Sequence, residues 1–181
     1  MSNKNSIYIA ISGRSGCGNT TVSRDIAERL GLKFINYTFR SIAKEDGISF
    51  EEVCHRAEKS DDDDLRVDQT QVKLARRQPS VLGSRLAIWM LEEADLKVFL
   101  TGSPKNRAAR IQHREGGTLD EQLAATTARD KRDHDRYKRL YDIDNNDFSL
   151  ADLVVNTDRL NAVQVADIIE AAARTLMSQP E

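Results

Sequence analysis

A glycine-rich turn lies between an apolar run and an amphipathic segment near the start of the 181-residue chain. Residues 7–12 are apolar and mostly β-branched, which predicts a buried strand. After the turn, from Thr20 onward, apolar residues recur at helical spacing: Val22, Ile26, Ala27 and Leu30. Gly31 follows as a helix C-cap. A buried strand that turns directly into a helix favours an α/β fold.

The rest of the chain alternates in the same way. Further strands are expected at about 33–36, 80–82, 96–101 and 152–156. Helices are expected at about 38–45, from Ser49, at 65–77, from Ser103 to about 116, at 118–141 and at 162–177. Ser49 with Glu52, and Thr118 with Glu121, have the spacing of capping boxes. The pattern predicts one α/β domain over residues 1–181, a parallel five-stranded sheet with helices on both faces.

Composition narrows the class of protein. Lys plus Arg number 27 and Asp plus Glu number 29, so the net charge is -2, which argues against a general nucleic-acid binder. The first apolar run is too short for a signal peptide or a membrane span, and we expect a cytoplasmic protein without membrane contact. Cys17 and Cys54 lie far apart and are expected to be thiols. The histidines are scattered, which makes a zinc site improbable.

The turn itself is typical of a phosphate-binding loop. Glycines at 13, 16 and 18 allow successive backbone N–H groups to point inward, and the following helix N-terminus favours an anion. Thr20 stands where the hydroxyl of such loops binds Mg²⁺. Asn19 stands where the loop pattern has lysine. The alternative is a glycine-rich turn that binds nothing.

A second feature is a stripe of arginines in the segment 118–141. Arg129, Arg132, Arg136 and Arg139 are spaced by three, four and three, which puts them on one helix face. Several guanidinium groups aimed together suit a polyphosphate. The alternative is an exposed helix with Asp–Arg ion pairs, but beside a phosphate loop a lid that closes over phosphates is the better interpretation. The aspartates at 61–64 are interpreted as a solvated turn and helix N-terminus.

The chain resembles the short, archaeal-type cytidylate kinases, within the nucleoside monophosphate kinase group of P-loop kinases, as a divergent member. The resemblance rests on segments in order along nearly the whole chain. These are IAISG (9–13), TVSR (21–24), AERLG (27–31), FRxxAKE (39–45), ISFEE (48–52), VDxxQ (67–71), VLxxRLAxW (81–89), ADLK (94–97), RAxRIxxREG (107–116), RYK (136–138), YxID (141–144) and DLVxNT (152–157).

This resemblance implies transfer of the γ-phosphoryl group of ATP to CMP or dCMP, giving CDP or dCDP and ADP, with Mg²⁺. It implies an acceptor-binding helical segment at about 36–78 and a lid with the arginine-rich helix at about 115–145. The implied partners are ATP and CMP or dCMP, and we expect a monomer. The implied ATP-binding residues are Gly13, Arg14, Ser15, Gly16, Cys17, Gly18, Asn19, Thr20 and Thr21, with Thr20 also on the metal. The implied CMP-binding residues are Arg40, Asp68 and Arg85, and the implied catalytic residues are Arg129, Arg132 and Arg136.

Two positions depart from the family pattern. Asn19 replaces the loop lysine, and Gly83 replaces an acidic residue near the metal. Arg14, or an arginine of the lid, could supply the missing positive charge. Two alternatives stay open on these residues: a P-loop kinase of another small acceptor, and a non-catalytic nucleotide-binding relative.

Overall fold

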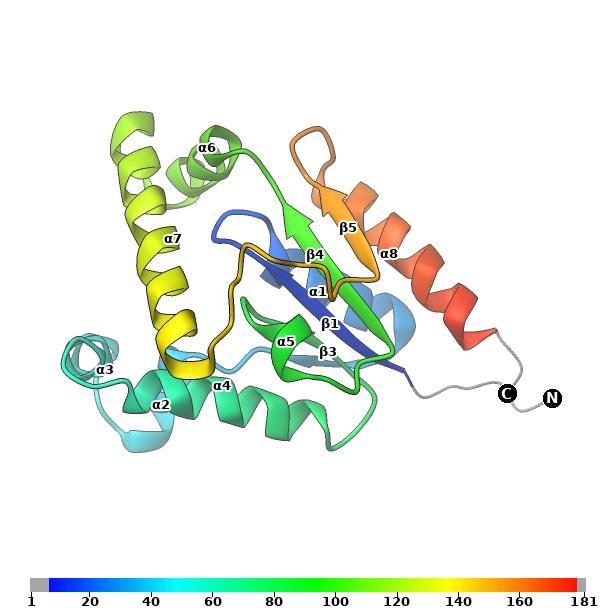
Figure 1. Ribbon diagram of the computed structural model, residues 1–181, viewed down its shortest axis with the longest axis horizontal. Helices are drawn as coiled ribbons and strands as arrows, with labels where there is room; N and C mark the ends of the chain where they lie inside the picture. Colours follow the sequence, from blue (N-terminus) through cyan, green and yellow to red (C-terminus); the bar gives the residue numbers. More distant parts are fainter. Residues whose placement is uncertain (1–6, 179–181) are drawn as a thin grey trace.

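The computed structural model describes residues 7–178 and contains a parallel sheet of five strands (Figure 1). The strands are β1 Tyr8–Gly13, β2 Lys33–Ile35, β3 Ser80–Gly83, β4 Leu96–Thr101 and β5 Leu153–Asn156, in the order β2-β3-β1-β4-β5. All four strand pairs are parallel, with Ile11 beside both Gly83 and Val98. The expected five-stranded parallel sheet is confirmed, and its strands end at one common edge.

Eight helices are present in the part of the chain that the structure describes. They are α1 Asn19–Leu30, α2 Phe39–Asp46, α3 Phe50–Ala57, α4 Asp62–Ala75, α5 Ala87–Met90, α6 Pro104–Glu115, α7 Leu119–Tyr141 and α8 Ala162–Met177. Gly31 ends α1 in the left-handed conformation, and the Thr118–Glu121 capping box opens α7, both as predicted. The short helix α5 was not expected, and α4 begins three residues earlier than predicted.

Both faces of the sheet are covered, as predicted. Alternate residues of β1 point to opposite faces, so Ile9 and Ile11 pack on one side and Ala10 on the other. The first face carries α1 and α8, which contribute Val22, Ile26, Val165 and Ile169. The second carries α4 and α5, which contribute Val72, Ala75, Ala87 and Ile88. Each of these helices is fixed by burial of its apolar stripe against the sheet.

Helices α2 and α3 have a small core of their own, formed by Tyr37, Ile42, Ala43 and Val53. Helix α7 runs outside the sheet, from α6 at its N-terminal end to the region of α2 and α4 at its C-terminal end (Figure 1). No helix within residues 7–178 is both long enough and apolar enough to cross a membrane.

The aspartates at 61–64 form the N-terminus of α4, as predicted, and Asp62 is exposed there, but the other three are not simply solvated. Asp64 forms an ion pair with Arg136, and Asp61 accepts hydrogen bonds from Arg139 at 2.5 and 2.9 Å. Asp63 is buried and bonded to Arg56 at 3.0 and 3.1 Å. The first turn of α4 therefore joins two helices, α3 and α7, through charge pairs.

Candidate functional site

A large cavity, ≈ 1040 Å³, lies at the edge where the strands end. Such an edge is where ligands bind in open α/β sheets. Its walls are the loop at 13–18, the N-terminal turn of α1, residues 36–40, α4, α7 and the start of α8. Every residue that the sequence assigned to ATP, CMP, metal or catalysis lines this cavity. The structure thus brings together residues from 13 to 136 that the sequence could relate only by analogy.

The glycine-rich loop has the conformation that its composition predicts. Gly16 and Gly18 have φ values of 83° and 96°, which side chains with a Cβ rarely adopt. A Cβ on Gly16 would also lie 2.7 Å from the backbone oxygen of Arg107. No side chain caps the N-terminus of α1, and Thr20 and Thr21 are exposed there. The first-turn N–H groups, which have no acceptor inside the helix, are therefore available to an anion.

Asn19 lines the cavity, but its amide is bonded to the loop itself. Its Nδ2 donates to the backbone oxygen of Gly13 at 2.7 Å, and its Oδ1 is buried without a hydrogen-bond partner in the described residues. The side chain thus folds back and holds the base of the loop. The position of the loop lysine therefore carries no positive charge of its own.

Gly83, the second departure, is explained by its neighbour on α1. A Cβ at Gly83 would lie 2.4 Å from Oγ and 2.7 Å from Cβ of Ser23, which is fully buried. A carboxylate side chain therefore does not fit at the end of β3 while Ser23 keeps this position. The absence of the acidic residue here is a packing requirement of the β3–α1 contact.

Three arginines that lie far from the loop in sequence hold its backbone and side chains. Arg85 donates to Ser15 Oγ at 3.0 Å, Arg107 to the Ser15 oxygen at 3.1 Å, and Arg110 to the Gly16 oxygen at 3.2 Å. Sequence reasoning gave no role to Arg107 and Arg110. Their position in the sequence could have indicated this role. Both lie in the helix that follows a central strand, and that helix begins at the same edge of the sheet as the loop.

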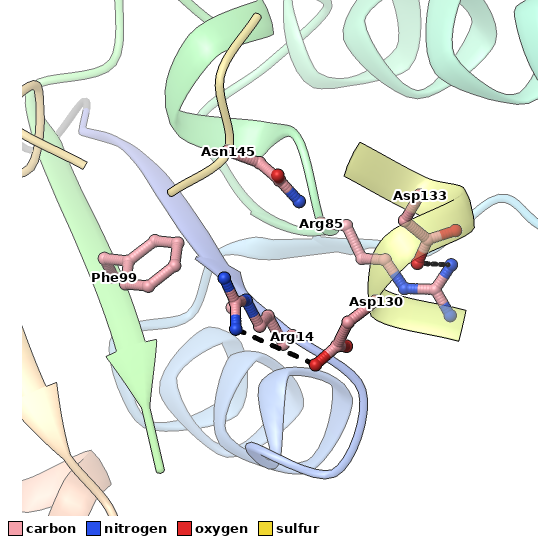
Figure 2. Close-up of a pocket in the computed structure, with 7 residues that line it drawn as sticks. Arg14, Arg85, Phe99, Asp130, Asp133 and Asn145 are labelled. Carbon is pink, nitrogen blue, oxygen red and sulfur yellow. Dashed lines mark ion pairs between the residues drawn. The ribbon is translucent and has the colours of Figure 1, made fainter. Parts of the chain in front are cut away.

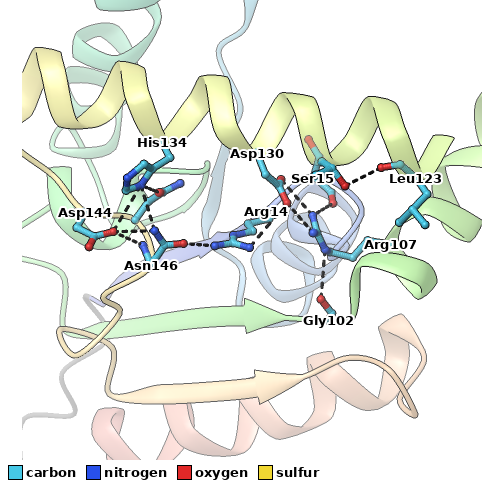
Figure 3. Close-up of polar contacts among 11 residues, drawn as sticks. Arg14, Ser15, Gly102, Arg107, Leu123, Asp130, His134, Asp144 and Asn146 are labelled. Atoms are coloured by element: carbon cyan, nitrogen blue, oxygen red, sulfur yellow. Dashed lines mark hydrogen bonds and ion pairs between the residues drawn. The ribbon is translucent and has the colours of Figure 1, made fainter. Parts of the chain in front are cut away.

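Aspartates of α7 connect this helix to the loop. Arg85 pairs with Asp133 at 3.0 Å, and Asp130 lies 3.8 Å from Arg14 (Figure 2). Asp130 also lies 2.6 Å from Arg107 (Figure 3). Arg14 also donates to Asn146, whose own amide contacts His134 and Asp144 (Figure 3). Burial raises the pKa of Asp133 although a guanidinium is adjacent. The inner face of α7 is therefore mixed in charge.

The arginine stripe divides into two classes. Arg129 and Arg132 line the cavity with no ion pair to any described residue, whereas Arg136 is paired with Asp64. Arg139, outside the cavity lining, is paired with Asp61. Two guanidinium groups thus remain open to an incoming anion. Arg136 must exchange its carboxylate for the ligand if it is to bind one.

The wall opposite the loop is built from residues 36–40, α3 and α4. Arg40 is exposed and its guanidinium lies 4.4 Å from the centroid of the Phe50 ring. Asp68 accepts a hydrogen bond from Tyr141 Oη at 2.9 Å, and burial raises the pKa of Asp68 to about 6.

Burial also raises the pKa of the Cys17 thiol, so this cysteine is not an activated nucleophile. Both Cys17 and Cys54 are free thiols in the structure, as expected.

The raised pKa of Asp68 gives a prediction for stability. The pKa of Asp68 is about 6 in the folded chain against 3.8 for an ordinary aspartate, so its contribution to stability is present below pH 4 and is lost as pH rises through 6. Asp68→Asn should therefore be more stable than wild type by about 1 kcal/mol at pH 7.5. Thermal melts at pH 4 to 7.5 measure the difference. If the difference in stability between Asp68→Asn and wild type does not increase with pH, the raised pKa of Asp68 is contradicted. Asp62→Asn, on the exposed side of α4, is the control.

Comparison with known proteins adds independent information. Residues 8–159 match the cytidylate kinase-like family. The chain is 44% identical over 165 residues to cytidylate kinase 2 of Borrelia garinii subsp. bavariensis, covering 89% of this chain and 93% of that protein. It is 39% identical over 171 residues to the cytidylate kinase of Pyrococcus horikoshii, covering 93% and 89%. Shikimate kinase from Acinetobacter baumannii has a similar fold, with a TM-score of 0.65 at 17% identity, covering 96% of each chain.

Proposed function

The chain belongs to the cytidylate kinase-like family, and from this membership we propose that it transfers the γ-phosphoryl group of ATP to CMP or dCMP. The expected resemblance and fold class are confirmed by the family match and by the similar fold of a small P-loop kinase. The observation that carries the proposal is the convergence of the anion-binding loop, two unpaired arginines and the acceptor wall on one cavity. A kinase of a non-nucleotide acceptor is less well supported, because relatives that are 39–44% identical are cytidylate kinases.

The loop binds the phosphates of ATP in this proposal. The N–H groups at the start of α1 donate to phosphate oxygens, and the helix dipole adds a favourable field. Gly13, Gly16 and Gly18 have no side chain, so the backbone can approach the phosphates closely, with Ser15 between them, while the Cys17 side chain is buried. Asn19 acts on the loop and not on the phosphate, because its amide donates to Gly13.

Transfer requires positioning and charge stabilisation, with no covalent enzyme intermediate. An oxygen of the CMP phosphate attacks the γ-phosphorus, and the bond from that phosphorus to the bridging oxygen of ADP breaks. The electron pair of that bond leaves on ADP. We assign Arg129 and Arg132 to the equatorial oxygens of the moving group, since both line the cavity unpaired. Arg136 joins them after it leaves Asp64.

Magnesium is proposed to arrive with ATP. Within residues 7–178 no group of three or more His, Cys, Asp or Glu side chains could hold a metal ion. Thr20, exposed at the first turn of α1, offers one hydroxyl ligand. This set fits Mg²⁺, which is usually bound through one or two protein oxygens together with substrate phosphates and water. When bound, the ion neutralises charge on the β- and γ-phosphates.

The acceptor nucleotide is assigned to the wall formed by residues 36–40 and α4, within the helical segment at 36–78. Arg40 and Arg85 are proposed to hold the CMP phosphate, and Asp68 to contact the nucleoside. Arg85 is anchored by Ser15 and Asp133, so it joins the loop, the acceptor side and α7. The segment at 115–145 is proposed to close as a lid and exclude water from the phosphoryl group.

A coupled assay tests this function. The wild-type chain with ATP and Mg²⁺ should form ADP with CMP or dCMP and much less with UMP, AMP, shikimate or gluconate. ADP at background with every acceptor would overturn the kinase proposal, and thermal shift with ATP and CMP would then identify a binding-only protein. ADP formed only with a non-nucleotide acceptor would establish the other small-acceptor kinase. We also propose that the protein acts as a monomer in the cytoplasm. Light scattering measures whether it is a monomer.

Arg14 is the candidate for the cation that replaces the loop lysine. It lies in the loop, lines the cavity and is oriented by Asn146 and Asp130. Arg14→Ala should lower kcat about tenfold, the effect of about 1.4 kcal/mol of transition-state stabilisation. Steady-state kinetics with saturating CMP measure it, and Arg24→Ala, on the exposed side of α1, is the matched control. An unchanged kcat would eliminate the compensating role.

A further inference from the structure

Gln71 is a buried polar residue on α4 for which the functional assignments above leave no role. Only 6% of its surface is exposed, and it lines the large cavity. Its side-chain oxygen Oε1 is buried and has no hydrogen-bond partner within residues 7–178. A buried acceptor without a partner costs about 1–3 kcal/mol, so such a group in a ligand cavity indicates a donor on the ligand.

The surroundings of Gln71 define which donor fits. Asp68 lies three residues earlier and therefore on the same face of α4. Its carboxylate is a second acceptor, and the Tyr141 hydroxyl that it contacts is already used as a donor to it. Tyr37 Oη donates to Glu45 at 2.5 Å and so does not satisfy Gln71. The wall of α4 thus presents two acceptors one turn apart.

We propose that Gln71 accepts a hydrogen bond from the exocyclic amino group of the cytosine base, with Asp68 as the adjacent acceptor, and so selects cytosine over uracil. The inference rests on the proposed function and assigns a specificity residue to the acceptor site. Cytosine carries an amino donor at C4, where uracil carries a carbonyl acceptor. With the Gln71 oxygen turned toward the base, uracil would place its own oxygen against two acceptors and leave the Gln71 oxygen unsatisfied.

Rotation of the Gln71 amide does not remove this selectivity. With Nε2 turned toward the base, Gln71 would donate to the uracil carbonyl at C4. The ionised Asp68 carboxylate would still face that oxygen, since a carboxylate can only accept. The pair of residues therefore favours an amino group even though the amide alone can present either end.

The hydrogen bond between cytosine and Gln71 is tested by removing the amino group from the substrate and the acceptor from the protein. The substrates are CMP, UMP and 2-pyrimidinone ribonucleoside monophosphate, which lacks the 4-amino group. Wild type should prefer CMP to the pyrimidinone nucleotide in kcat/KM by about 10–100-fold, the range for one buried hydrogen bond. Gln71→Met, of similar length and without an acceptor, should reduce that preference to below about threefold, mainly by loss of CMP activity. Gln69→Met, exposed on α4, should behave as wild type.

Each result bears on a different assignment. If Gln71→Met lowers kcat/KM equally for CMP and for the pyrimidinone nucleotide, Gln71 has only a structural role, and the inference is overturned. If that variant does not fold, the wild-type preference decides, because a preference under threefold also overturns it. Wild type without activity on any nucleoside monophosphate would instead refute the proposed function.

Discussion

Replacing Arg132 by alanine is expected to lower kcat by about 10²–10³-fold, with a small change in KM for CMP. Arg132 lines the cavity and forms no ion pair with any residue in 7–178. Its charge is therefore available to the transferring phosphoryl group without loss of an existing contact. A group that acts on the transition state changes kcat more than ground-state binding.

Steady-state kinetics with ATP and CMP measure this effect. Lys131→Ala is the matched control, because Lys131 is on the same helix, is exposed and pairs with Asp135 at 2.7 Å. It should leave kcat unchanged. If Arg132→Ala and Lys131→Ala behave alike, Arg132 does not act on the moving phosphoryl group. Arg136→Ala should have a weaker effect on kcat than Arg132→Ala, because Arg136 must first leave Asp64.

Arg107→Met should have the largest effect on stability. Arg107 is 2% exposed and donates to Asp130 at 2.6 and 3.2 Å, to the Gly102 oxygen at 3.2 Å and to the Ser15 oxygen at 3.1 Å. Methionine fills similar space but leaves a largely buried carboxylate and two carbonyl oxygens without this donor. Removing one partner of a buried pair costs about 3–5 kcal/mol, and we expect about 3 because Arg14 is near Asp130.

The melting temperature should fall by about 6–12 °C in Arg107→Met. Arg107→Met with Asp130→Asn should recover part of this loss, because the unpaired charge is removed. Arg174→Met is the control, since Arg174 pairs with Glu170 on an exposed helix face and should change stability by less than about 0.5 kcal/mol. If Arg107→Met melts like the control, the buried pair is not a support of the loop.

The elements with a regular pattern could be predicted from local sequence. The period of apolar residues placed β1, α1 and α8, and the glycines at 16 and 18 predicted the loop conformation, since positive φ favours glycine. The short helix α5 was missed because four residues are too few to show a helical repeat of apolar residues. The start of α4 was placed late because its first turn is a run of aspartates with no apolar residue.

For the candidate site, the sequence identified residues that the structure places around one cavity, but not their pairing. Spacing puts Arg129, Arg132, Arg136 and Arg139 on one face, yet it cannot say which of them meet a carboxylate. Arg139 pairs with Asp61, which is 78 residues away. Arg107, buried among loop atoms, looked like any helix arginine. An ion pair depends on distances between elements that only packing sets.

The class of fold, the glycine-rich loop and the family could be inferred from the amino-acid sequence alone, because these depend on period, on glycine conformation and on motif order. The distribution of charge around the loop follows from the tertiary structure. The tertiary structure buries Arg107 against Asp130, turns Asn19 back onto Gly13, and leaves Arg129 and Arg132 without an ion-pair partner in the described chain. It also leaves the Gln71 oxygen without a partner there, because hydrogen-bond satisfaction depends on which atoms meet after the helices have packed.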